Sequence, residues 1–356
     1  MSRRIDILLA TYNGEKYIDK QIKSLVTQDR DGLDAELRLI IRDDGSTDST
    51  MDIIRKRLEY YRTKRENPIE VHILDDNTPT GSPSGNFVKL LNVTNADYVM
   101  FSDQDDMWYR RKVKTTFECM KKLEKKYGKT TPLMVHTDLS LMDESGRKIA
   151  ESFYEYQKLP VQKNSQKTAQ KNSVSSTNGA AGSEDGSVFK SDSLNRLLIQ
   201  NTVTGCTIMM NKAAADLLRK APESEMVLMY DHYAAILVAA TGHIAFVDEP
   251  LIRYRQHSGN MVGAHAADSK EEYKMRLDFG REKFLKDMDL SYSQVGYIVK
   301  RYEDEIRKAK GDETVELLKE YSNLIMAGKL ERLQFFQKHD VYKNGALKKL
   351  VQMIWC

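Results

Sequence analysis

The fold of this chain is decided by the stretch YVMFSDQDD at residues 98–106. Its first half, residues 98–101, has the length and the aromatic and β-branched content of a buried strand. Its second half brings three carboxylates, Asp103, Asp105 and Asp106, to the carboxyl end of that strand, where open α/β sheets bind their ligands. Acidic residues are also common in turns and helix caps, so the cluster alone is a hypothesis for a site.

Around this stretch, short β-rich runs alternate with segments of helical periodicity over about the first 140 residues, which predicts an α/β fold. Its sheet would be mixed but mostly parallel and flanked by helices. The expected strands are 5–10, 36–42, 71–74, 98–101 and 133–141, and the expected helices are 14–28, one capped by Thr47 or Asp48, 87–91 and 109–127. Farther along, we expect helices near 190–200, from 211 and from about 230, and one or two strands within 243–254.

A second polar cluster follows the first two expected strands. The segment TYNG at residues 11–14 ends the first strand, and DDGS at residues 43–46 ends the second. Tyr12 is suited to stack on a base, and a carboxylate there is suited to accept a hydrogen bond from a pyrimidine N–H or a ribose hydroxyl. Asp-Gly is also a good turn sequence, so a structural role is the alternative. The glycines fit neither the P-loop nor the dinucleotide-binding fingerprint.

The acidic turn at 103–106 favours a divalent cation and a phosphorylated ligand. Mg²⁺ and Mn²⁺ prefer oxygen ligands, and they usually bind one or two protein carboxylates together with phosphates of the substrate. A nucleoside diphosphate is therefore the natural third component of such a site.

The composition excludes several classes of protein. The 356 residues include 55 Lys and Arg against 52 Asp and Glu, so the net charge of +3 does not indicate a nucleic-acid partner. The longest mostly apolar run, 234–247, is shorter than the ~18 residues that a bilayer-spanning helix needs. The first residues form too short an apolar run for a signal peptide. Three distant cysteines, Cys119, Cys206 and Cys356, favour a reducing compartment, so we expect a cytoplasmic protein.

The chain also divides by composition. Residues 1–265 form the expected α/β domain, in which the polar stretch 162–187 is expected to be a loop or insertion. Residues 266–356 are rich in Lys, Glu, Leu and Tyr, which predicts amphipathic helices as a C-terminal appendage. The last residues, 347–356, combine apolar and basic side chains. Both a helix packed on the domain and a membrane-surface helix fit that pattern, and the packed helix is favoured.

Three motifs in this order resemble the inverting glycosyltransferases of family 2, which have the GT-A fold. They are ILLATYNG at 7–14, RDDGSTD at 42–48 and SDQDDMW at 102–108. Three later segments are similar to those of bacterial rhamnosyltransferases that build cell-wall polysaccharides, namely NTVTGC at 201–206, MYDH at 229–232 and YRQHSGN at 254–260. The resemblance covers about residues 4–265 and does not reach the C-terminal helices.

This resemblance implies a role for each candidate residue. Tyr12 and either Asp43 or Asp44 would hold the nucleoside. Asp105 would hold a metal, and Asp103 would hold the metal or the ribose. Asp231 takes the position of the catalytic base, and an acceptor hydroxyl that attacks an anomeric carbon must indeed lose its proton as the bond forms. The remaining candidates are Thr11, Asn13, Glu15 and Gly205 for the nucleotide sugar and His257 for the metal.

Structural roles are the alternatives for several of these residues. Asp231 would also suit a helix N-cap, and His257 would suit a histidine bonded to backbone. His232 is expected to be structural. Arg253 and Arg255 would either pair with phosphates or stay solvated, and Trp108 would either stack on an acceptor or pack in the core.

The activity that the resemblance implies is an inverting, Mn²⁺- or Mg²⁺-dependent transfer of L-rhamnose from dTDP-L-rhamnose to a growing, lipid-linked cell-surface polysaccharide. The expected partners are the nucleotide-sugar donor and the saccharide acceptor. Contact of the C-terminal helices with the inner face of the plasma membrane is the alternative to their packing on the domain. A UDP-hexose donor, an inactive GT-A scaffold subunit and a nucleotidyltransferase are the alternatives. Intact Asp105 and Asp231 count against the scaffold, and the Asp231 segment would have no purpose in a nucleotidyltransferase.

Overall fold

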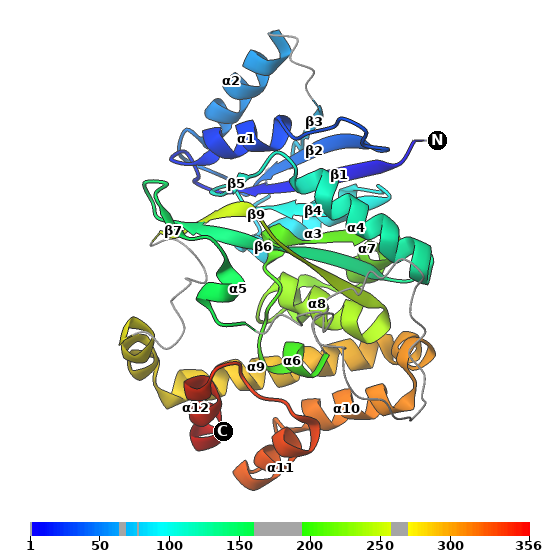
Figure 1. Cartoon of the computed structure of the whole chain (residues 1–356), viewed down its shortest axis with the longest axis vertical. Coiled ribbons are helices and arrows are strands. Elements are labelled where there is room, and N and C mark those ends of the chain that lie inside the picture. Colours follow the sequence, from blue (N-terminus) through cyan, green and yellow to red (C-terminus); the bar gives the residue numbers. More distant parts are fainter. Residues whose placement is uncertain (1, 64–68, 77, 160–193, 258–269) are drawn as a thin grey trace, which may run out of the picture.

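The computed structural model describes residues 2–63, 69–76, 78–159, 194–257 and 270–356. Its centre is one mixed sheet with helices on both faces (Figure 1). The expected loop at 162–187 and the expected domain boundary at residue 265 lie outside the described residues.

Nine strands of the described chain make up this sheet in the order β3-β2-β1-β4-β8-β6-β9-β5, and β7 pairs with β6. They are β1 (Arg4–Thr11), β2 (Glu36–Asp43), β3 (Glu70–Ile73), β4 (Tyr98–Ser102), β5 (Met107–Trp108), β6 (Leu133–Met142), β7 (Lys148–Ala150), β8 (Met209–Asn211) and β9 (His243–Arg255). The five strands expected in the first part of the chain are confirmed, and the segment 243–254 forms the single strand β9. The short strands β5, β7 and β8 were not expected, because two or three residues carry no readable alternation.

Strand register brings the candidate segments to one edge of the sheet. β1 pairs in parallel with β2 on one side and with β4 on the other. Thr11 stands beside Asp43, and Leu9 stands beside Ser102. The three turns that follow these strands therefore meet at the carboxyl edge, as the sequence predicts.

The helices of the first part are α1 (Ile18–Val26), α2 (Thr50–Thr63), α3 (Pro83–Val93), α4 (Lys112–Tyr127), α5 (Phe153–Tyr156), α6 (Leu194–Ile199), α7 (Lys212–Arg219) and α8 (Tyr230–Thr241), with 3₁₀ turns η1 (Gly205–Thr207) and η2 (Glu223–Glu225). The start at 14 expected for the first helix is wrong, because the Gly14 N–H donates to the Thr50 hydroxyl and the Glu15 N–H to Asp48. Of the two caps expected for the next helix, Asp48 accepts the N–H of Thr50, the first residue of α2, at 3.0 Å, whereas Thr47 does not cap it. The Thr47 N–H donates to Asn13, and α2 begins only at Thr50.

Helix α4 also begins later than predicted, at Lys112 instead of residue 109. The Tyr109 N–H donates to the Leu251 carbonyl at 3.0 Å, which keeps this residue alongside β9. The helix therefore starts only after the chain has left the sheet.

The C-terminal part is helical, as expected. It consists of α9 (Lys270–Lys310), α10 (Asp312–Asn323), α11 (Lys329–His339) and α12 (Ala346–Trp355), and α9 has non-helical backbone at Gly280 and Tyr302. In Figure 1 these helices lie at the end of the molecule opposite α2.

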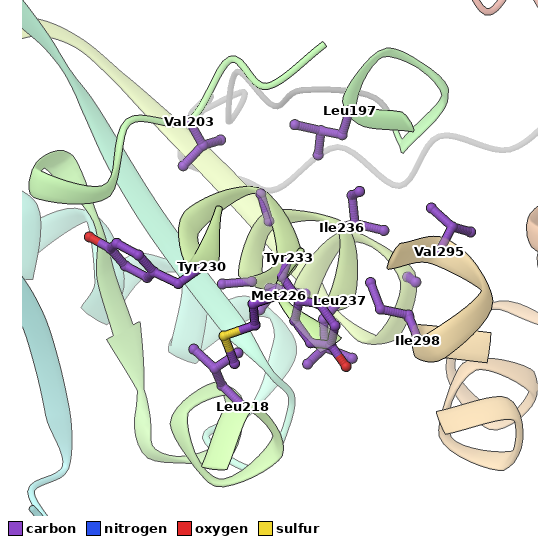
Figure 2. Packing of buried hydrophobic residues seen from close by; sticks show 14 of the residues in the cluster. Leu197, Val203, Leu218, Met226, Tyr230, Tyr233, Ile236, Leu237, Val295 and Ile298 are labelled. Carbon is purple, nitrogen blue, oxygen red and sulfur yellow. The ribbon is translucent and has the colours of Figure 1, made fainter. Parts of the chain in front are cut away.

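Helix α8 joins the C-terminal helices to the sheet. It is buried over nearly its whole length, so Tyr233 and Leu237 belong to one hydrophobic cluster with Phe101 of the sheet and Val295 of α9. Figure 2 shows Ile236 and Leu237 of α8 beside Val295 and Ile298, with Leu197 and Val203 above the helix. A second cluster, on the opposite face of the sheet, packs α1 and α4. No helix within the described residues combines the length and the apolar character needed to cross a bilayer.

Candidate active site

The first turn presents Tyr12 on a fixed backbone. The side-chain amide of Gln104 accepts the Tyr12 N–H at 2.9 Å and donates to the Tyr12 carbonyl at 2.8 Å. A Cβ at Gly14 would lie 2.3 Å from Gln104 Oε1, so glycine is needed there to keep this clamp. The Tyr12 ring itself is 56% exposed, which leaves a face for stacking. Gln104 has no recognisable signal in the sequence, because its role depends on a contact between residues 92 positions apart.

The carboxylate of Asp43 fastens the first turn to the second. Its Oδ1 accepts the hydroxyls of Thr11 at 2.8 Å and Ser46 at 2.6 Å, and its Oδ2 accepts the Ser46 N–H at 2.7 Å. Asn13, which has a positive φ of 46°, accepts the Thr47 N–H at 2.9 Å. Glu15 accepts the N–H of residue 49 at 3.0 Å. The predicted nucleotide-binding residues of both turns are therefore together, and they brace one another.

Asp44 is buried beneath this edge. It accepts hydrogen bonds from the buried Arg42 at 2.8 Å, from the Thr80 N–H at 2.7 Å and from the Gly81 N–H at 2.9 Å. Burial tends to raise the pKa of Asp44, but the Arg42 and Thr80 hydrogen bonds outweigh it and hold the pKa below its ordinary value. Arg42 also donates to Asn86, so this network ties the loop before α3 to β2.

The acidic turn after β4 brings a predicted pair together. His257 Nε2 lies 2.7 Å from Asp105 Oδ2, and the His257 ring lies 5.0 Å from the ring of Tyr17. Gln21 holds the start of the turn, because its amide donates to the Ser102 hydroxyl and to the Asp103 carbonyl.

Asp106 faces the interior from the same turn. Its Oδ1 accepts the Arg255 N–H at 3.1 Å, and its Oδ2 is buried without a hydrogen-bond partner among the described residues. One ligand atom each of Asp103, Asp106 and Cys206 lies within 4.8 Å of the others. Burial and neighbouring carboxylates raise the pKa of Asp103 and Asp106. Such crowded carboxylates fit a site that a divalent cation neutralises.

Two residues below the turn complete its surroundings. Trp108 is buried, which confirms its packing role and leaves no exposed ring face for an acceptor. The ammonium of Lys112 lies 4.3 Å from the centre of that ring and has no hydrogen-bond partner within the described chain. Burial lowers the pKa of Lys112 to about 7.

Asp231 lies in the first turn of α8. The N-cap of this helix is Met229, so the alternative of an Asp231 N-cap is wrong. Its carboxylate accepts the Gly205 N–H at 2.8 Å and the Asn201 amide at 3.0 Å. Burial raises its pKa to about 6 against these hydrogen bonds, and its charge in turn raises the pKa of Asp103. Asp231 therefore belongs to the same electrostatic cluster as the acidic turn.

Tyr230 is a further candidate site residue, which sequence reasoning missed. Its ring packs against Phe87 at 4.6 Å and Phe101 at 5.2 Å between ring centres, and Figure 2 shows its hydroxyl pointing away from the packed core of α8. This hydroxyl is buried and without a hydrogen-bond partner in the described part of the chain. A Cβ at Gly205 would lie 2.1 Å from it, so only glycine fits there. The available signal was its position next to Asp231.

The other three basic residues considered from the sequence, His232, Arg253 and Arg255, are hydrogen-bonded to backbone carbonyls. His232 Nε2 lies 2.6 Å from the Leu197 carbonyl, and burial lowers its pKa to about 4, which confirms its structural role. Arg255 is buried and donates to the carbonyls of Asp105 and Glu144, both at 2.9 Å, so it is not a solvated strand charge. Arg253 donates to the Gly146 carbonyl.

The chain is similar to several known glycosyltransferases. Residues 6–162 match the family model of glycosyl transferase family 2. The dTDP-rhamnosyl transferase RfbG of Shigella flexneri is 37% identical over 116 residues, which are 32% of this chain and 36% of that protein. The poly(ribitol-phosphate) beta-glucosyltransferase of Bacillus spizizenii is 32% identical over 103 residues, 29% of this chain and 15% of that protein. The matches thus span about a third or less of these relatives' lengths.

A solved structure resembles almost the whole chain. The crystal structure of S. aureus TarS 1–349 in complex with UDP matches 95% of this chain and 88% of its own, with a TM-score of 0.51 and 15% sequence identity. At that identity the likeness concerns the fold. The sheet with its flanking and C-terminal helices has the GT-A fold, and residues 6–162 match the model of glycosyl transferase family 2.

Proposed function

We propose that this chain is an inverting glycosyltransferase that moves a sugar from a nucleoside-diphosphate donor to an acceptor hydroxyl. One observation carries the proposal. A buried carboxylate, Asp231, shares an electrostatic cluster with Asp103 of the acidic turn at the ligand-binding edge of the sheet. A general base near the leaving group's phosphates is the minimum that inversion requires.

Asp231 is the proposed base. The acceptor oxygen forms a bond to the anomeric carbon while the bond from that carbon to the diphosphate breaks, and the acceptor proton moves to the Asp231 carboxylate. A pKa of about 6 suits this role, because the group is ionised at neutral pH and still more basic than an ordinary aspartate. Gly205 and Asn201 keep the carboxylate oriented through their hydrogen bonds.

Asp103, Asp105 and His257 are the proposed metal ligands. The 2.7 Å approach of His257 to Asp105 and the raised pKa of Asp103 support this set. When bound, Mn²⁺ or Mg²⁺ would neutralise charge on the departing diphosphate.

The nucleoside site is proposed at the two braced turns. Tyr12 offers an exposed ring for the base, and Asp43 and Asp44 end the neighbouring strand, where Asp43 stands beside Thr11. Thr11, Asn13 and Glu15 would act through the shape of the turns, because their hydrogen bonds join the two segments. Gly205 would let backbone approach the donor sugar.

For the donor we favour dTDP-L-rhamnose, because the relative RfbG is named a dTDP-rhamnosyl transferase. A UDP-hexose is the second candidate, because TarS was crystallised with UDP. The proposed acceptor is a growing, lipid-linked cell-surface polysaccharide, handled on the cytoplasmic side of the membrane. The scaffold alternative would not need the buried, hydrogen-bonded Asp231.

Thermal unfolding with a panel of dTDP-, UDP- and GDP-sugars, each with and without Mn²⁺, tests this proposal. A ligand that binds only the folded chain at 100 times its Kd stabilises it by about 2.7 kcal/mol. We expect the largest Mn²⁺-dependent shift with dTDP-rhamnose. A larger shift with a UDP-sugar would change the donor, and no shift with any sugar would overturn the transferase in favour of the scaffold.

A further inference from the structure

Helix α12 turns apolar side chains outward. Leu350, Met353 and Ile354 are exposed and share one face, because they are spaced three and four residues apart. The opposite face buries Lys348, whose ammonium lies 3.1 Å from Gln157 Oε1, and Gln352, which donates to the Val341 carbonyl. A surface helix of a globular protein normally shows the reverse arrangement.

A second element extends this apolar surface. The ammonium of Lys329, at the start of α11, donates to the Ile354 carbonyl at 2.6 Å and so holds the two helices together. Met326 and Leu330, on either side of Lys329, are 89% and 69% exposed. The C-terminal apolar patch is defined as Ile325, Met326, Leu330, Leu350, Met353 and Ile354, all of which are exposed.

The charge around the patch identifies its occupant. Apart from the inward-facing Lys348, residues 325–356 contain five Lys and Arg but two Asp and Glu, whereas the whole chain has 55 against 52. Lys329 and Lys349 are exposed beside the apolar side chains. Basic side chains around exposed apolar ones complement anionic headgroups over an acyl layer. A second copy of the chain would instead bring like charges together.

We propose that the C-terminal apolar patch docks on the surface of a bilayer that contains anionic lipids. The contact is peripheral and reversible, because one short helix with few positive charges binds lipid weakly. It does not depend on the proposed transfer reaction, since lipid binding is measured without donor or acceptor.

Vesicle flotation of the full chain tests this docking. We expect the chain to float with vesicles of equal parts phosphatidylcholine and phosphatidylglycerol, to stay behind with pure phosphatidylcholine, and to be released by high salt. The double variant Leu350→Glu/Ile354→Glu should lose flotation to the level of pure phosphatidylcholine. Val93→Glu on α3 is the matched control, because Val93 is 53% exposed against 52% for Leu350, and it should float like the parent chain.

Two further readouts keep the test decisive. Circular dichroism and the donor-induced thermal shift should be the same in the double variant and the parent, which separates this proposal from the proposed function. Should the double variant not fold, Met326→Gln/Leu330→Gln probes the same patch at its most exposed positions. Undiminished flotation of a folded patch variant overturns the proposal. Self-association that the variant abolishes, in a chain that never floats, would also overturn it.

Discussion

The two polar regions at the edge of the sheet, the braced turns and the acidic turn, differ in how fully their polar groups are hydrogen-bonded. In the braced turns, Asp43 and Asp44 accept hydrogen bonds from both side chains and backbone. Around the acidic turn, Asp106 Oδ2 and the Tyr230 hydroxyl are buried without a partner among the described residues. Satisfied groups fix a shape, whereas buried groups left unpaired are costly unless a ligand completes them. The braced turns are therefore suited to hold a ligand in a fixed position, and the surroundings of the acidic turn are suited to take part in the reaction.

This difference extends to acidity. Burial tends to raise the pKa of both Asp44 and Asp231, but Asp44 has enough hydrogen bonds to end below its ordinary value. Asp231 ends at about 6, since the Gly205 and Asn201 hydrogen bonds only partly offset its burial. Perturbed acidity of this kind is typical of catalytic groups.

Replacing the proposed base should have the largest effect. Asp231→Asn keeps the shape and the acceptor oxygen but cannot take a proton, so transfer should fall by ~10²–10⁴-fold. The donor-induced thermal shift should be retained. Asp216→Asn, at an exposed position on α7, is the control and should keep full turnover. Turnover near that of the parent enzyme in Asp231→Asn would remove it from the role of base.

The braced region should instead respond in stability. Arg42→Met leaves the buried Asp44 without its guanidinium partner, and breaking a buried pair in this way costs ~3–5 kcal/mol. Urea unfolding of both chains measures this difference. Arg55→Met, at an exposed position on α2, is the control and should cost little. A loss in Arg42→Met no greater than in Arg55→Met would show that the two regions do not differ as described.

The pH dependence sharpens the comparison further. Because transfer needs ionised Asp231, kcat/KM should rise with pH to a plateau above about 6 and be about tenfold lower at about pH 5. The same raised pKa has the opposite effect on stability, which should decrease with rising pH. The folded chain retains a proton that the unfolded chain releases from pH 3.8 upward, so stability should fall as pH rises from 3.8 to about 6. A melting temperature that falls no more in the parent than in Asp231→Asn across this window would contradict the raised pKa.

The braced turns could be predicted from the sequence better than the acidic turn and its surroundings. The strands before both turns are mostly apolar, so their order and their common edge could be anticipated. The partners of the polar groups could not. Arg42 reaches Asn86 across 44 residues, and Asp106 meets the Arg255 backbone across 149, and neither pairing leaves a local pattern. Asp105 and His257 were paired only through the resemblance of their motifs to a known family.

The smallest expected effect concerns Tyr230, and it separates packing from chemistry at one atom. Tyr230→Phe keeps the ring contacts with Phe87 and Phe101 and removes only the buried hydroxyl. Because that hydroxyl has no partner in the described chain, the free energy of unfolding should not fall, and it should rise by up to about 1 kcal/mol.

Tyr230→Phe should slow transfer although it does not lower the free energy of unfolding. If the hydroxyl completes its hydrogen bonding on the donor or acceptor, kcat/KM falls by about three- to tenfold, the equivalent of one neutral hydrogen bond. Tyr292→Phe is the matched control, since its hydroxyl is also buried and unpartnered among the described residues but lies in the C-terminal helices. Equal kcat/KM in Tyr230→Phe and Tyr292→Phe would assign the Tyr230 hydroxyl to packing and leave the reacting region to its carboxylates alone.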